Sequence, residues 1–124
     1  MDKDINPESE KPVKESTNSP NTKNQTGSAD GNTTIEFFRK EIDQFVQERG
    51  WKPYHTPKDL AIAISIEAGE LLETFLFNKS DFPIEKKQEN TKEEIADIFI
   101  YLISLVNAMD IDLSKTVFSK LEKN

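Results

Sequence analysis

Thr56-Pro-Lys-Asp-Leu-Ala-Ile-Ala-Ile-Ser-Ile-Glu67-Ala-Gly-Glu70-Leu-Leu-Glu73 is the stretch that decides the fold. Thr56 suits the N-cap of a helix and Pro57 its first position, so a helix is predicted from here to about Phe77. Its side chains are apolar over much of the circumference, so we expect the central, buried helix of the domain. Charged residues are seldom buried unless they are paired or bind a metal, so Glu67 and Glu70 need an explanation.

A second acidic signature, Glu94-Ile-Ala-Asp97, lies in the apolar run Glu93–Met109. In both signatures the acids are three residues apart, so each pair shares one face of its helix. Four partly desolvated carboxylates repel one another unless a cation neutralises them. Oxygen-only ligands suit Mg²⁺, with Mn²⁺ as a substitute. The alternative is that these acids simply face solvent on amphipathic helices.

Other classes of site and partner fit the composition less well. The chain has no cysteine and one histidine, His55, which argues against zinc sites and against a di-iron site built on Glu-x-x-His pairs. A net charge of −7 argues against a basic groove for a nucleic-acid polymer. No apolar run is long enough to span a membrane, and residues 1–20 contain no secretory h-region. We therefore expect a cytoplasmic protein.

The remaining pattern predicts an all-α domain of about four helices over residues 33–124. A first helix is expected from Thr33 to Gly50, which suits a C′ position. A polar connection, residues 78–90, precedes a helix that begins at Thr91 or earlier and ends near Met109. Asp112 is expected to cap a last helix. Residues 1–32 are polar and proline-containing, which predicts a disordered tail.

The connection Trp51-Lys-Pro-Tyr-His55 holds more aromatic side chains than a turn needs. Periodicity alone favours Trp51 and Tyr54 as a plug at one end of a helix bundle. The functional alternative is a wall on which a base stacks, beside the imidazole of His55.

The order and spacing of these acidic, aromatic and apolar segments resemble those of the MazG-like nucleotide pyrophosphohydrolases, especially the branch close to dCTP pyrophosphatase. The resemblance covers residues 34–124 and rests on Trp51, His55–Leu60, Ser65–Glu73, Glu94–Leu102, Asp112-Leu113 and Lys120–Asn124. It implies an all-α, MazG-like helical bundle that assembles as a homodimer or homotetramer. It also implies Mg²⁺-dependent cleavage of a nucleoside triphosphate to the monophosphate and pyrophosphate.

Residue roles follow from the resemblance position by position. The implied metal ligands are Glu67, Glu70, Glu94 and Asp97, and Glu70 is our choice for a general base. The implied substrate-side residues are Trp51, His55, Tyr101, Lys120 and Asn124.

Two features depart from the family pattern. Phe77 stands where this branch commonly has tryptophan. A base can still stack on Phe77, but the pocket is expected to be reshaped, which weakens the case for cytosine. Family members usually continue past Asn124 with basic residues, so a wall of the pocket is expected to be incomplete or supplied by another subunit.

The leading hypothesis is therefore a homo-oligomeric nucleoside triphosphate pyrophosphohydrolase that cleanses or balances the nucleotide pool. Its substrate would be a deoxynucleotide, with dCTP or a modified deoxynucleotide as candidates. The rival hypothesis is a non-catalytic, metal-stabilised helical interaction module.

Overall fold

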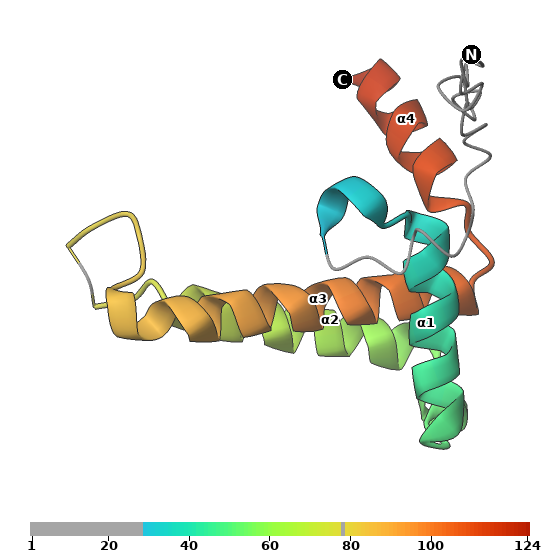
Figure 1. Cartoon of the computed structure of the whole chain (residues 1–124), viewed down its shortest axis with the longest axis horizontal. Helices are drawn as coiled ribbons and strands as arrows, with labels where there is room; N and C mark the ends of the chain where they lie inside the picture. The colour runs from blue at the N-terminus through green and yellow to red at the C-terminus, as the bar shows by residue number, and fades with distance from the viewer. Residues whose placement is uncertain (1–28, 78) are drawn as a thin grey trace, which may run out of the picture. The chain divides into compact units, whose positions relative to one another are not determined.

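The structure, a computed structural model, describes residues 29–77 and 79–124. Its secondary structure over these ranges is helical, without strands, which confirms the all-α prediction. The four α-helices are α1 (Ile35–Glu48), α2 (Pro57–Glu73), α3 (Gln88–Ala108) and α4 (Leu113–Lys123) (Figure 1). None of these described helices is both long and apolar enough to cross a membrane.

The described residues fall into two units, and all four α-helices lie in the second, Ile35–Asn124. Most of the polar tail predicted over residues 1–32 lies outside the described residues. Its described end contains a short 3-10 helix, Asp30–Asn32. Thr33, predicted to begin the first helix, instead donates its hydroxyl to the Ala29 carbonyl at 2.8 Å.

Helix α1 ends at Glu48, and Gly50 follows it as the predicted C′ residue. The Gly50 and Trp51 amides donate to the carbonyls of Gln47 at 3.0 Å and Val46 at 3.1 Å, which is a Schellman motif. Gly50 has a φ of 66°, a left-handed conformation that glycine adopts without steric cost. The ring of Trp51 packs against Phe45 with centroids 5.7 Å apart. The motif therefore fixes the place of the Trp51 side chain.

Helix α2 starts where Thr56 accepts a hydrogen bond from the Asp59 amide at 3.3 Å, which confirms the predicted N-cap. It packs against α3 along its length (Figure 1), and Leu60 is 1% exposed. The prediction that α2 is the central, buried helix is wrong within this chain, because Ile62, Ile66 and Leu72 remain 48–59% exposed. Within this chain α3 covers only one side of α2, so an apolar face stays open.

The best-buried core lies between α1 and α3, where Ile42, Val46, Ile103 and Val106 pack together. Arg39 links this core to the connection before α4. Its guanidinium donates to the Asn107 side chain at 2.9 Å and to the Ile111 carbonyl at 2.6 Å. Asp112 then accepts a hydrogen bond from the Lys115 amide at 3.0 Å, which confirms the predicted cap of α4.

Two helix ends differ from the most direct prediction. Helix α2 ends at Glu73, before the predicted Phe77, and Thr74 is its C-cap. Helix α3 begins at Gln88, the earlier start that the sequence left open, so Thr91 is not a cap. The Thr91 hydroxyl lies in the helix interface and contacts the Thr74 hydroxyl at 2.9 Å.

Alanine at two glycines should shift stability in opposite directions. Gly50→Ala should lower the free energy of unfolding by about 1 kcal/mol, because a Cβ strains the left-handed conformation. Gly69→Ala, inside α2, should raise it by about 1 kcal/mol through helix propensity. A Cβ at either position meets open space, so packing does not mask the backbone effect. Urea unfolding measures both values, and equal shifts would contradict the assigned Gly50 conformation.

Candidate metal centre

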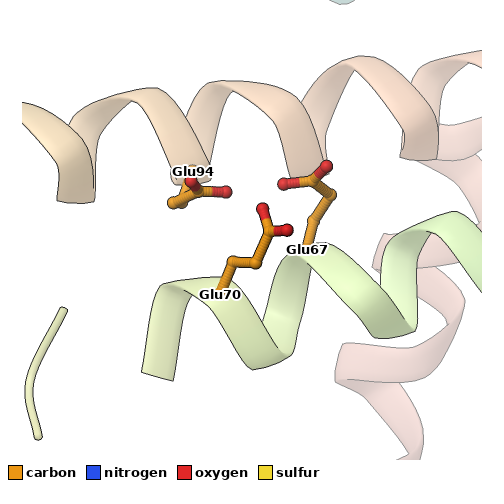
Figure 2. Close-up of side chains that lie close together, drawn as sticks. All are labelled: Glu67, Glu70 and Glu94. Carbon is orange, nitrogen blue, oxygen red and sulfur yellow. The ribbon is translucent and has the colours of Figure 1, made fainter. Parts of the chain in front are cut away.

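Three glutamates from two helices meet in the gap between α2 and α3. Glu67 and Glu70 come from α2 and Glu94 from α3, and one carboxylate oxygen of each lies within 4.8 Å of the others. Figure 2 shows the three side chains pointing toward one another. The three-residue spacing puts Glu67 and Glu70 on the α2 face that α3 covers. The structure thus brings together three of the four acids predicted as metal ligands.

The electrostatics of this group favour a bound cation. The Glu67 carboxyl has its pKa raised from 4.5 to about 7, first by a hydrogen bond with Glu94 and then by burial. A hydrogen bond and the negative charge of Glu70 raise this pKa further. Oε2 of Glu67 and Oε2 of Glu94 are buried and have no hydrogen-bond partner among the described residues. Buried, unpaired carboxylate oxygens are costly, and a cation would satisfy them.

The donor set fits a hard divalent ion. Its ligand atoms are carboxylate oxygens only, as Mg²⁺ and Mn²⁺ prefer. Asp97 stands outside the group of three, half-buried and one turn farther along α3. Its role as a ligand stays a prediction. Glu73 is exposed and also stands outside the group.

A row of aromatic rings leads from the surface toward the acidic helix face of α3. The ring centroids of Trp51 and His55 lie 6.0 Å apart, and those of His55 and Tyr101 lie 6.2 Å apart. Tyr101 follows Asp97 by one helical turn, so the row ends on the face that carries the acids. Trp51 is 44% exposed. Both predicted roles of Trp51 therefore have support: its ring packs on Phe45, yet part of it remains open for stacking.

The other predicted substrate residues lie on exposed parts of the chain. The Phe77 side chain is fully exposed, at a φ of 63°. Lys120 and Asn124 are exposed at the end of α4. Among the described residues, no hydrogen bond or ion pair joins these three side chains to the glutamates. Their roles in substrate binding stay predictions.

Arg49, directly after the end of α1, is a residue that the sequence did not single out. Its guanidinium carbon lies 3.4 Å from the ring centroid of Phe45 and 5.8 Å from that of Trp51. Cation–aromatic contacts of this kind hold the two partners together. The four-residue spacing of Phe45 and Arg49 at the end of a predicted helix was the available signal. Arg49 therefore stiffens the outer end of the aromatic row.

Comparison with known proteins gives three kinds of match. Residues 62–124 match the model of the MazG-like family. The dCTP pyrophosphatase 1 proteins of Rattus norvegicus and Homo sapiens are 33% and 32% identical to the chain over 96 residues, or 73% of it. The chain spans 56% of the length of these relatives.

A solved structure also matches the fold. The crystal structure of a pyrophosphatase from Archaeoglobus fulgidus superposes with a TM-score of 0.66 and shares 40% sequence identity. The match covers 73% of this chain and 87% of that one.

The raised pKa of Glu67 predicts how stability depends on pH without metal. Between about pH 4.5 and pH 7 folded Glu67 keeps a proton that the unfolded chain releases, so the free energy of unfolding should fall as pH rises through this window. Glu67→Gln should flatten this part of the profile, whereas Glu73→Gln should not. Urea unfolding in EDTA at a series of pH values measures this dependence for the wild type and both variants. Identical slopes for the three proteins would contradict the raised pKa of Glu67.

Proposed function

Because this chain belongs to the MazG-like family, we propose that it is a divalent-metal-dependent nucleoside triphosphate pyrophosphohydrolase of the nucleotide pool. The observation that carries this proposal is the group of Glu67, Glu70 and Glu94, with two buried carboxylate oxygens that have no hydrogen-bond partner in the described part of the chain. The matches to dCTP pyrophosphatase 1 and to the Archaeoglobus pyrophosphatase support the same reaction. We place the protein in the cytoplasm.

Mg²⁺, or Mn²⁺ in its place, would neutralise phosphate charge and polarise the phosphoryl group when bound. Glu67 and Glu94 are half-buried and suited to hold the ion, with Asp97 as a further candidate ligand. Glu70 is the most exposed of the three glutamates. Its carboxylate can orient a water and accept its proton as the water oxygen bonds to the α-phosphorus. The bond from that phosphorus to the bridging oxygen breaks, which releases pyrophosphate and leaves the nucleoside monophosphate.

The aromatic row is the proposed base-recognition element. The open part of the Trp51 ring offers a stacking surface, and Arg49 and Phe45 hold this ring in place. His55 Nδ1 is buried without a hydrogen-bond partner among the described residues. This nitrogen is therefore available for a hydrogen bond with a polar group of the substrate. We propose a deoxynucleoside triphosphate as substrate, either dCTP or one with a modified base. Tyr101, Lys120 and Asn124 are proposed to contact its sugar or phosphates.

We also propose that the active protein is a homodimer or homotetramer. The open face of α2 carries Ile62, Ile66 and Leu72, and α4 exposes Val117, Phe118 and Leu121. Apolar faces of this extent mark interaction surfaces in soluble proteins. A second copy would cover them and would bring further side chains to the substrate, Phe77 among the candidates.

Product analysis tests the reaction directly. The purified protein should convert one or more deoxynucleoside triphosphates to monophosphate and pyrophosphate with Mg²⁺ and not with EDTA. Ion-exchange chromatography separates the possible products. Diphosphate with phosphate would show that a different bond breaks. Stabilisation by metal without any turnover across common and modified nucleotides would favour a non-catalytic helical module.

Replacing Glu70 tests its assigned role. Glu70→Gln should lower kcat by at least about a hundredfold, because the amide cannot accept the proton, while helicity is retained. Glu73→Gln, with the same change on an exposed acid one turn away, should retain most activity. Circular dichroism and steady-state kinetics measure both. Full activity of Glu70→Gln would remove Glu70 from the mechanism.

A charge on the open face of α2 tests the proposed assembly. Ile66→Glu should shift the protein to a smaller oligomer, because a buried, unpaired carboxylate opposes association. Lys40→Glu, on an exposed face of α1, is the control and should leave the mass unchanged. Light scattering after gel filtration gives the mass, and an unchanged mass for Ile66→Glu would exclude this face from the interface.

A further inference from the structure

A pair of buried threonines joins the end of α2 to the first turn of α3. The hydroxyls of Thr74 and Thr91 lie 2.9 Å apart, and the two residues are 7% and 9% exposed. Thr74 donates its proton to the Leu71 carbonyl at 2.8 Å, so it accepts from Thr91. The Thr91 hydroxyl also donates to the Lys87 carbonyl at 3.0 Å, so its single proton is shared between the two acceptors. One short network thus ties together the last turn of α2 and the first turn of α3.

This network lies one helical turn from the glutamates on both helices. Thr74 follows Glu70 by four residues, and Thr91 precedes Glu94 by three. Residues at these spacings share a helix face, with their Cβ atoms about 5–6 Å apart. The threonine pair therefore sits directly beside the facing pair of Glu70 and Glu94. Any sliding of α2 along α3 would break the hydroxyl contact and displace these carboxylates by the same amount.

A hydrogen bond restrains sliding better than the apolar packing elsewhere along these helices. Hydroxyl contacts weaken steeply once distance and angle depart from their optimum. Isoleucine and leucine side chains are tolerant of small repacking, so they set the helix register less sharply. A single buried polar contact can define the register of packed helices, at some cost in stability.

We propose that the Thr74–Thr91 hydrogen bond is a positioning device that sets the register of Glu70 against Glu94 and so favours Mg²⁺ over Ca²⁺. This inference rests on the metal centre of the proposed function. Mg²⁺ demands nearly ideal octahedral geometry at about 2.1 Å, whereas Ca²⁺ accepts more ligands at about 2.3–2.6 Å in flexible arrangements. A loosened register therefore penalises Mg²⁺ more than Ca²⁺.

Thr91→Val tests the proposal, because valine keeps the shape of threonine and removes the hydroxyl. Calorimetric titration of the full chain with MgCl₂ or CaCl₂, without nucleotide, gives the two affinities. We expect Mg²⁺ affinity to fall about tenfold or more, as changes next to metal ligands commonly cause, and Ca²⁺ affinity to fall much less. Thr91→Ser retains the hydroxyl and should restore the wild-type ratio of the two affinities.

Ser104→Ala is the matched control. Its hydroxyl is also buried in α3, but it donates to the Ile100 carbonyl of the same helix at 2.9 Å. Its removal should leave the Mg²⁺ to Ca²⁺ ratio unchanged. Should Thr91→Val fail to fold, Thr74→Val removes the acceptor and is judged by the same ratio.

The outcomes separate this inference from the function on which it rests. If the wild-type chain binds Mg²⁺ and Thr91→Val leaves the ratio unchanged, the positioning role is overturned and the metal centre stands. If the wild-type chain binds neither ion, the metal centre fails and the inference fails with it. A loss of Mg²⁺ preference that Thr91→Ser does not share supports the proposal.

Discussion

Repulsion among three carboxylates in a partly desolvated gap is the constraint on which the rest of the structure depends. Helices α2 and α3 pack against one another, and this packing brings carboxylate oxygens of Glu67, Glu70 and Glu94 within 4.8 Å of one another. Such crowding is tolerable only if a proton or a cation compensates the charge. The packing of the two longest described helices therefore decides how closely the glutamates approach, and so whether they need a proton or a cation.

The helices themselves could be predicted because their ends carry local signals. Thr56, Gly50 and Asp112 each act at the positions that their short-range chemistry indicates. The burial of α2 could not be predicted in this way. A row of isoleucines and leucines has the same periodicity whether it faces a core or stays open, as Ile66 does. Only the arrangement of the neighbouring helices decides between these outcomes.

The candidate site likewise has one part that local sequence signals predict and another that they do not. The spacing of Glu67 and Glu70 and the apolar setting of Glu94 were sufficient to predict their convergence. The side chains of Phe77, Lys120 and Asn124 are exposed, so the contacts within the described chain do not decide their roles. The sequence left open whether α3 begins at Thr91 or earlier, because threonine at a helix start resembles a cap; the Thr91 hydroxyl instead contacts Thr74 of the facing segment. Contacts between distant segments leave no periodic trace in a sequence.

The Schellman turn at Gly50 has a consequence for how such a protein can change over evolutionary time. Backbone hydrogen bonds of α1 hold the chain that carries Trp51, while the glutamates depend on the packing of α2 and α3. Side chains on that turn can vary without altering the backbone bonds that hold it. The two parts can therefore diversify separately, so that the turn can acquire new side chains while the group of three glutamates stays unchanged.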